Sequence, residues 1–311
     1  MRIGYADLVF AVRYEGAGRL PAFRGTTLRG ALGYALRSTV CGLRRQECTT
    51  CLLRNRCAFP NVFEGVAPAD RNFMRKYPFM PQPFVMRVRH QAPSEIRAGD
   101  ADEFGIRCFG SSLAFYPYIV MAVIEAGRRG LGRDRIPFTV TRISDGTEVI
   151  HDPAHGGDLR TPAIRAADAA PADQRRPVRL HLDFVTPVRI RTGGSINRLP
   201  GLPAIVRAAI RRLRILHHFY GEGEGLSGDV TPLLDSAAAA GNTSSSLRPY
   251  SLRRRSTRQR TDMELDGVVG GATYELNDGT LIPLFQMAEA CHIGKATSFG
   301  FGRIAYRVSH P

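Results

Sequence analysis

The stretch from residue 292 to residue 303 reads HIGKATSFGFGR, and it decides how the chain around it is interpreted. Its closely spaced glycines predict a loop whose backbone takes conformations that other residues avoid. A helix is predicted before this loop, at 281–290, and a strand after it, at 303–308. A shorter echo of the loop, Gly130-Leu131-Gly132-Arg133, lies in the first half of the chain, also between a predicted helix and a predicted strand.

The elements around the two loops follow one plan twice: strand, helix, middle strands, helix, glycine-rich loop, strand. This order predicts an α+β fold of two tandem ferredoxin-like βαββαβ domains. In the first half we expect strands at 5–14, 84–90, 104–109 and 136–143, a helix that starts at Gly25-Thr26-Thr27 with a Thr as N-cap, and a second helix at 113–126. In the second half we expect strands at 178–190 and 303–308, a hairpin of 263–269 and 272–276 around Gly270-Gly271, and helices at 203–220 and 281–290.

Composition separates these two halves. Residues 152–177 are rich in Pro, Ala, Gly and charged residues, which is typical of a linker or a long surface loop. We therefore expect an N-terminal domain at 1–155, a linker at 156–177 and a C-terminal domain at 178–311, whose glycine-rich loop is at 294–302. A second segment, from 221 to about 259, is expected to be loose.

The charge of the chain predicts a polyanionic partner. Lys and Arg number 43 against 28 Asp and Glu, which gives a formal net charge of +15, and Lys76 and Lys295 are the only lysines. Guanidinium groups match phosphate and stack on bases, so nucleic acid is the first candidate. A high-GC genome explains why arginine stands in place of lysine, but it does not explain why basic residues outnumber acidic ones. With no signal-peptide core and no apolar stretch long enough for a bilayer, we expect a cytoplasmic protein without a membrane partner.

Basic residues concentrate on the predicted helix at 203–220, in the run 253–260 and around the glycine-rich loop. The helix face carries no acid, the run is flanked by predicted structure, and glycine N–H groups can surround an anion. The alternatives are a solvated helix face, a disordered run and an ordinary tight turn. We predict nucleic-acid contacts from Arg207, Arg211, Arg214, Arg253, Arg254, Arg255, Arg258, Arg260, Gly294, Lys295, Gly300, Gly302 and Arg303.

A cysteine-rich insert at 38–65 is the strongest metal signal. Cys41, Cys48, Cys51 and Cys57 give the spacing C-x₆-C-x₂-C-x₅-C, and four thiolates in such a short span can close a tetrahedral zinc site resembling a zinc knuckle. Because four protein ligands leave no open position, the predicted role is structural. The alternatives are an iron–sulfur cluster and unligated thiols.

Several segments resemble the RAMP-superfamily endoribonucleases of CRISPR systems, and together they cover most of the chain. The resemblance is carried by FRGTTLRGALG at 23–33, the four cysteines, TPVRI at 186–190 and, most specifically, the segment at 292–303. It implies paired RAMP/RRM-like ferredoxin folds, RNA as substrate and metal-independent cleavage. In that chemistry the 2′-hydroxyl attacks the adjacent phosphate, which leaves a 2′,3′-cyclic phosphate and a 5′-hydroxyl.

The catalytic residues are less clear, because related enzymes often carry a histidine near the first helix and residues 20–60 contain none. The candidates are His292, which matches the family's His-x-Gly-Lys, His218, which sits among cations, and Tyr34 on the first helix. Lys295, Arg29 and Arg37 are candidates for stabilising the phosphate. For each histidine taken singly, a structural role is the competing interpretation.

We therefore expect an endoribonuclease that cleaves precursor crRNA within its repeats and retains the repeat hairpin, with other Cas effector subunits as further partners. The alternative is a non-catalytic RAMP subunit that binds or caps crRNA in an effector complex, which the missing histidine favours. A zinc-stabilised RNA-binding protein outside CRISPR systems is a third interpretation, which the C-terminal motif argues against.

Overall fold

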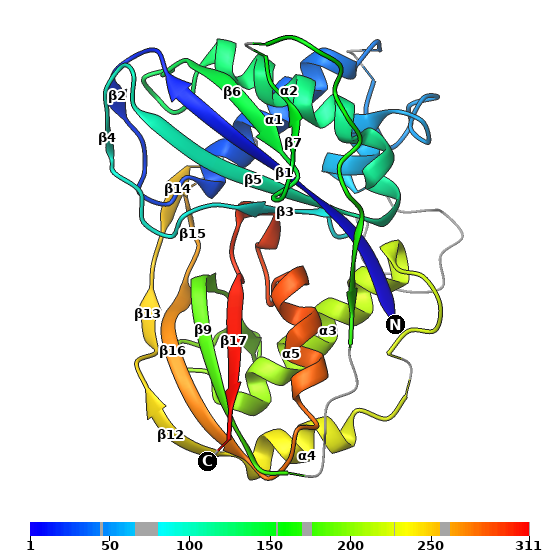
Figure 1. Ribbon diagram of the computed structural model, residues 1–311, viewed down its shortest axis with the longest axis vertical. Helices are drawn as coiled ribbons and strands as arrows, with labels where there is room; N and C mark the ends of the chain where they lie inside the picture. Colours follow the sequence, from blue (N-terminus) through cyan, green and yellow to red (C-terminus); the bar gives the residue numbers. More distant parts are fainter. Residues whose placement is uncertain are drawn as a thin grey trace. The chain divides into compact units, whose positions relative to one another are not determined.

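The chain forms two compact units that each combine helices with antiparallel sheets (Figure 1). A computed structural model describes all residues except 44–45, 66–79, 154, 170–175, 227, 256–261 and 311. One unit is Gly4–Arg165, and the other is Ala166–Pro311 together with Met1–Ile3. The mixed α and β composition agrees with the sequence. The limits expected for domains and linker stay predictions, although strand β8 (Arg165–Asp168) lies inside the range assigned to the linker.

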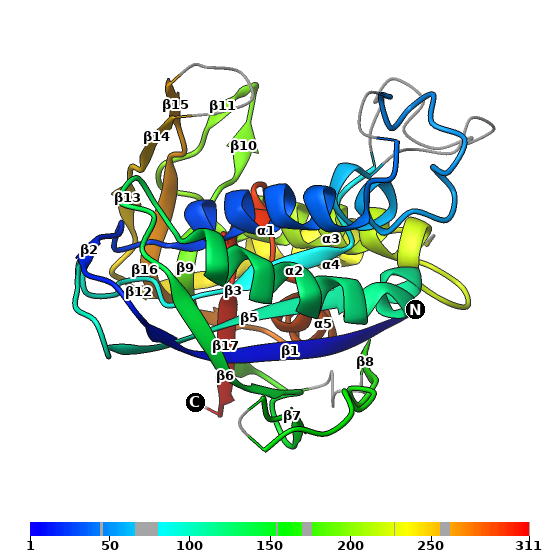
Figure 2. The ribbon, with the colours of Figure 1, turned by 90° about the horizontal axis from the view of Figure 1, so that it is seen from above.

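The Gly4–Arg165 unit is built on a sheet whose strands run in the order β3-β5-β1-β6-β7. Strand β1 alternates, so that Leu8, Phe10 and Val12 are buried on one face. Helices α1 and α2 lie side by side on this sheet (Figure 2). The elements are β1 (Arg2–Tyr14), β2 (Gly18–Arg19), α1 (Gly25–Val40), a π-helical turn (Phe59–Glu64), β3 (Phe84–Arg87), β4 (Glu95–Ile96), β5 (Ala101–Phe109), a 3₁₀ turn (Gly110–Phe115), α2 (Tyr116–Arg129), β6 (Phe138–Ser144) and β7 (Val149–His151).

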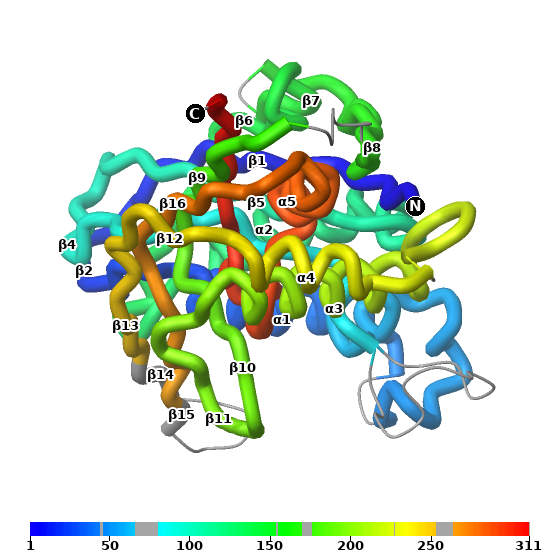
Figure 3. Tube along the Cα trace, turned by 90° about the horizontal axis from the view of Figure 1, so that it is seen from below, coloured from blue at the N-terminus to red at the C-terminus, as the bar shows by residue number. Residues whose placement is uncertain are grey.

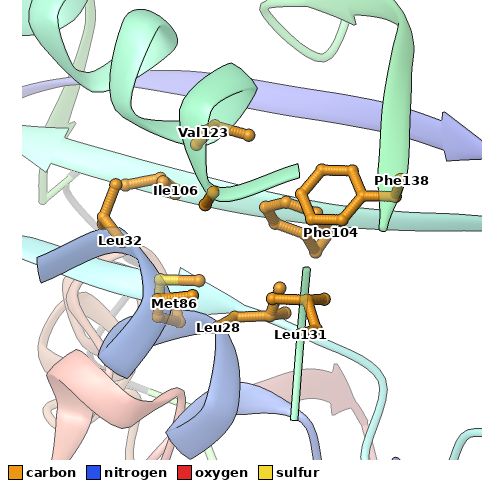
Figure 4. Close-up of a pocket in the computed structure, with 10 residues that line it drawn as sticks. Leu28, Leu32, Met86, Phe104, Ile106, Val123, Leu131 and Phe138 are labelled. Atoms are coloured by element: carbon orange, nitrogen blue, oxygen red, sulfur yellow. The ribbon is translucent and has the colours of Figure 1, made fainter. Parts of the chain in front are cut away.

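The core of this unit fills the space between the two helices and the sheet (Figure 4). Leu28 and Leu32 come from α1, Val123 from α2, and Phe104 and Ile106 from β5. The remaining void measures about 10 Å³, no more than one water molecule needs, so the packing is close. Such packing fixes α1 and α2 firmly and therefore also the side chains on their outer faces.

The Ala166–Pro311 unit has a sheet in the order β12-β16-β9-β17, and β13 also pairs with β16. Helix α3 packs with α4 and α5 (Figure 3). The elements are β9 (Val178–Val188), β10 (Arg191–Thr192), β11 (Ser195–Ile196), α3 (Leu202–Tyr220), α4 (Thr231–Ala239), β12 (Gly241–Ser245), β13 (Arg248–Tyr250), β14 (Arg253–Arg255), β15 (Asp262–Glu264), β16 (Gly267–Leu276), α5 (Ile282–Cys291), a 3₁₀ turn (Thr297–Phe299) and β17 (Ile304–Ser309).

Three local predictions are wrong. The hairpin expected around Gly270-Gly271 is one continuous strand, β16, with a register shift between Val268 and Gly270. Gly270 has φ of +107°, and a β-carbon there would lie 2.3 Å from the carbonyl oxygen of Ser246, so the glycine allows a neighbouring chain to approach rather than a turn. Helix α1 starts at Gly25 with Arg24, not a threonine, at the N-cap. The segment expected to be loose contains α4, β12 and β13.

Across the described part of the chain, no helix combines the length and the apolar character that crossing a membrane requires.

Candidate functional site

A solvent-open hollow of about 330 Å³ lies on the outer side of α1 and α2 in the Gly4–Arg165 unit. Its lining consists of Tyr34, Arg37, Ser38, Cys41 and Arg129. The first four occupy positions i, i+3, i+4 and i+7 of α1 and its C-cap, which places them on one side of the helix, and the last is the final residue of α2. The hollow thus gathers two guanidinium groups, a phenol and a hydroxyl.

The cations of this hollow are held by aromatic rings and by one acid. The guanidinium carbon of Arg129 lies 5.0 Å from the centre of the Tyr34 ring, and its Nε donates to Glu125 at 2.6 Å. The guanidinium of Arg37 lies 5.7 Å from the centre of the Phe59 ring. Tyr34 is 66% exposed and keeps its hydroxyl accessible. Guanidinium groups fixed beside hydroxyl donors are suited to binding a phosphodiester.

Arg29 lies on α1 one turn before this hollow and is half-buried, with its guanidinium 4.4 Å from the centre of the Phe63 ring. Phe63 stacks on Phe59 and on Phe84 at 5.5 and 6.0 Å. Gly33 sits under this stack, because a β-carbon there would come within 2.1 Å of Phe63. Arg29, Gly33 and Arg37 follow one another at helical spacing on α1, and the aromatic cover over that face explains the glycine between the two arginines.

The glycine-rich loop belongs to the other unit, and its geometry depends on left-handed backbone. Gly294, Gly300 and Gly302 have φ of +77°, +88° and +81°. A β-carbon on Gly302 would lie 2.0 Å from the carbonyl oxygen of Ile293, so the chain closes tightly there. Lys295 is exposed, and its backbone N–H donates to Arg189 at 2.9 Å. An exposed lysine on a loop of this kind is suited to contact with a phosphate.

His292 is buried at the base of this loop and is 1% exposed. Its Nδ1 lies 3.0 Å from the carbonyl oxygen of Phe301, which links the two ends of the loop. Arg303, at the other end, is half-buried, and its backbone N–H donates to Thr186. The burial of His292 favours a positioning role over direct contact with substrate, while its predicted catalytic role stays a prediction.

Helix α3 presents Arg207, Arg211 and His218 to solvent. Arg214 is half-buried instead, because its Nε and Nη2 donate to the carbonyl oxygens of Leu226 and Gly228 at 2.7 and 3.0 Å. It therefore holds the following loop. Arg212, which no sequence pattern singles out, is 7% exposed and donates from Nε to the carbonyl oxygen of Cys291. Arg212 lies on the apolar stripe of the helix, where no sequence pattern indicates that an arginine holds the end of α5.

Two hairpins, β10–β11 and β14–β15, extend side by side from this unit (Figures 2 and 3). Arg253, Arg254 and Arg255 form β14 and pair with β15, so the predicted basic run is carried by a hairpin arm. Arg258 and Arg260 lie outside the described residues.

The four cysteines of the insert are free and half-buried. Cys41 caps the C-terminus of α1, and the turns that follow include hydrogen bonds from Thr50 to Glu47 and from Arg54 to Cys51. Burial raises the pKa of Cys48 and of Cys57. No group of three or more His, Cys, Asp or Glu side chains within the described ranges is arranged to hold a metal ion, so the insert does not form a closed site as it stands.

Comparisons with known proteins cover both halves of the chain. Residues 3–163 match the family model AF_1859_N, an N-terminal domain, and residues 182–304 match the model of the CRISPR-associated endoribonuclease Cas6. A comparison with curated proteins found no match.

Solved structures show the same fold over nearly the whole chain. The Cas6 (TTHB231) product complex has a TM-score of 0.57 at 14% identity and covers 97% of this chain and 99% of its own. The Thermus thermophilus Cas6 (TTHB231) structure has 0.54 at 13%, covering 97% and 98%. The Cas6 (TTHA0078) product complex has 0.51 at 19%, covering 98% and 99%. The AF_1859_N model spans just over half of the chain, so the chain belongs to that family, and its residues 182–304 match the Cas6 endoribonuclease model. The solved structures show that the chain has the fold of Cas6 proteins.

Proposed function

We propose that the protein is a cytoplasmic endoribonuclease that cleaves precursor crRNA within its repeats and retains the repeat hairpin. The observation that carries this proposal is the match of residues 182–304 to the Cas6 endoribonuclease model. The net charge of +15 supports an RNA substrate. Related structures are titled as Cas6 product complexes and as a Cas6-RT-Cas1–Cas2 complex, which supports repeat RNA and other Cas subunits as partners.

Each unit is, in this proposal, one ferredoxin-like domain. In Gly4–Arg165 the elements β1, α1, β3, β5, α2 and β6 follow one another, and the strands lie in the order β3-β5-β1-β6. In Ala166–Pro311 the corresponding elements are β9, α3, β12, β16, α5 and β17, in the order β12-β16-β9-β17. In both sheets the strands lie in the order second, third, first and fourth of the chain order. Corresponding strands therefore occupy equivalent places, as a duplicated βαββαβ unit requires.

Cleavage proceeds through attack of a 2′-hydroxyl on the adjacent phosphate. The 2′-oxygen forms a bond to phosphorus and loses its proton, the bond to the 5′-oxygen breaks, and that oxygen takes up a proton. The products are a 2′,3′-cyclic phosphate and a 5′-hydroxyl. The nucleophile belongs to the RNA, so no metal-bound water is needed and the step proceeds without a metal ion.

The hollow on α1 supplies groups suited to this step. Arg37 and Arg129 stabilise the charge that develops on the non-bridging oxygens. The exposed hydroxyl of Tyr34 is placed to donate a hydrogen bond or a proton to the leaving oxygen. The roles of Tyr34 and Arg37 fall on α1, within the range 20–60 that contains no histidine, and Arg129 adds a cation from α2.

The cysteine-rich insert, we further propose, takes up one structural zinc ion through Cys41, Cys48, Cys51 and Cys57. All four thiols are half-buried within one short segment, and the hydrogen-bonded turn that follows Cys51 suits the centre of a C-x₂-C knuckle. Binding draws the thiolates together, since zinc sites of this kind commonly close only around the metal. The ion would hold the segment that follows α1.

Incubation of the purified protein with its cognate repeat RNA in EDTA tests the function. We expect one cut per repeat, with a 2′,3′-cyclic phosphate on the upstream fragment. Tight binding of the correct repeat without cleavage would reject the enzyme. It would favour the non-catalytic RAMP subunit, which the absence of a histidine on α1 also supports.

A further inference from the structure

The centre of β1 holds a buried acid, Asp7, whose side chain is 1% exposed. It faces Arg107 of β5 directly across the sheet. Nε of Arg107 donates to one carboxylate oxygen at 2.8 Å, and Nη2 donates to the other at 2.7 Å. This bidentate pair by itself neutralises the buried charge of Asp7. The Arg107 guanidinium also lies 4.1 Å from the centre of the Tyr5 ring.

Two more arginines nevertheless share the same carboxylate. Nη1 of Arg87 lies 3.0 Å and Nη1 of Arg165 lies 3.4 Å from Oδ2 of Asp7. The carboxylate of Asp145 lies 4.0 Å from Nη2 of Arg165, so three guanidinium groups and two carboxylates leave a local net charge of +1. Cations this close repel one another, so neutralisation of Asp7 does not explain the second and third arginines.

These two arginines also differ from Arg107 in exposure. The side chain of Arg107 is 9% exposed, whereas those of Arg87 and Arg165 are 28% and 33% exposed. Among the described residues Arg87 uses only its Nη1, on Asp7. Nη2 of Arg165 donates to the carbonyl oxygen of Asp145 and to Oγ1 of Thr147, and it lies 4.0 Å from the Asp145 carboxylate. Both are held in place while part of each guanidinium stays open to solvent.

Small residues lie beside this group on the surface of the sheet. Asp7 alternates with the buried Leu8 and Phe10, so it lies on the sheet face opposite α1 and α2. Along the same face β1 continues with Val9, which pairs with Gly105 of β5. The residues next to the fixed cations on this face are therefore small, and Val9 is half-buried.

We propose that Arg87 and Arg165 form a phosphate-binding site for RNA on this face, held in place by Asp7 and Arg107. The site rests on the proposed function, since its ligand is a phosphate of the repeat RNA. It binds rather than cleaves, because the hollow with Tyr34 lies on the helix side of the sheet. Asp7 serves as an organiser: it orients the guanidinium groups before RNA arrives, so less ordering entropy is lost on binding.

Repeat-RNA affinity measured across salt concentrations tests this site in the intact protein. In the double variant R87Q/R165Q we expect weaker binding and a smaller slope of log K against log salt, by about 0.7 for each phosphate of single-stranded RNA that the variant no longer neutralises. The double variant R97Q/R133Q removes two exposed arginines of the same unit and controls for net charge. Cleavage by this control at saturating RNA should match the wild type.

The single variants R87Q and R87K separate a binding role from a structural one. If the site binds phosphate, R87K keeps most of the salt slope, R87Q loses it, and both melt within a few degrees of the wild type because Arg107 still pairs with Asp7. A slope for R87Q/R165Q equal to that of R97Q/R133Q would overturn the inference, as would a lower melting temperature with an unchanged slope. Failure of the wild type to cleave the repeat would instead count against the proposed function.

Discussion

Nδ1 of His292 lies 3.0 Å from the carbonyl oxygen of Phe301, and this one bond joins the first and last turns of the glycine-rich loop. His292 is the family-matching histidine and also has a positive φ of +58°, so its backbone and its side chain both serve the loop. The burial and the contacts of His292 favour a positioning role, and the catalytic role proposed for the hollow beside α1 and α2 can be tested against the predicted catalytic role of His292.

Replacing His292 with alanine separates these two roles. Loss of the bond leaves the carbonyl of Phe301 without this partner, and we expect a loss of about 1–3 kcal/mol in unfolding free energy. RNA binding by the loop should weaken with it. If His292 were the base, cleavage at saturating RNA would fall by orders of magnitude while chemical denaturation stayed unchanged, and that result would contradict the positioning role.

Tyr34→Phe tests the hollow on α1. Removal of the hydroxyl should slow single-turnover cleavage by about 10²–10⁴-fold if it protonates the leaving oxygen, with the dissociation constant for repeat RNA unchanged. Tyr118→Phe on α2, another exposed tyrosine, is the matched control and should cleave normally. Equal rates for both variants would remove Tyr34 from the mechanism.

Asp7 makes the stability of the Gly4–Arg165 unit depend on pH. Burial would raise its pKa, but the hydrogen bonds and charges of Arg107 and Arg87 outweigh burial and hold the pKa below the ordinary value for aspartate. Because the pKa in the folded state is depressed, its contribution is complete above the unfolded pKa of about 3.9 and is lost as pH falls through the folded pKa.

Asp7→Asn should therefore destabilise the protein at pH 7, by about 3–5 kcal/mol for a broken buried pair. The difference from the wild type should shrink as pH is lowered below about 4, because the carboxylate of the unfolded chain takes up a proton there and that of the folded protein follows at a lower pH. Urea unfolding between pH 7 and pH 2 measures both curves. Curves that stay parallel over this range would show that the charge of Asp7 contributes nothing.

Zinc binding by the insert can be measured independently of RNA cleavage. We expect one zinc per chain by metal analysis and loss of that zinc in Cys51→Ser. Cys108→Ala removes a buried thiol of β5 and should keep the metal even if its melting temperature falls. Purified wild-type protein that contains no zinc and takes none up would reject the site.

The sequence predicted most elements of both units because helical and strand periods are long and clear, as in α3 and β1. The predictions failed where one residue type suits two different local structures. Gly270-Gly271 has the composition of a hairpin turn, yet the register of β16 against β9 makes it a bulge under Ser246. Asp7, Arg87 and Arg165 are far apart in the chain, so no local pattern signals their meeting, and only the pairing of strands reveals it.

Two glycines of α1 provide a matched test of the aromatic cover over the Arg29 face. A β-carbon at Gly30 meets nothing within 4 Å, whereas one at Gly33 would lie 2.1 Å from Phe63, which is held in a stack with Phe59 and Phe84. Gly30→Ala should stabilise the protein by about 0.5–1 kcal/mol through helix propensity alone. Gly33→Ala should destabilise it by about 1–3 kcal/mol because the stack must shift.

The same shift should displace Arg29, whose guanidinium rests on the Phe63 ring, and should weaken RNA binding in Gly33→Ala but not in Gly30→Ala. Thermal melting and RNA titration of the two variants measure both effects. If the two alanines had the same effect on stability and on RNA affinity, Phe63 would not be packed against Gly33 in solution, and the aromatic rings would not support the cationic face of α1.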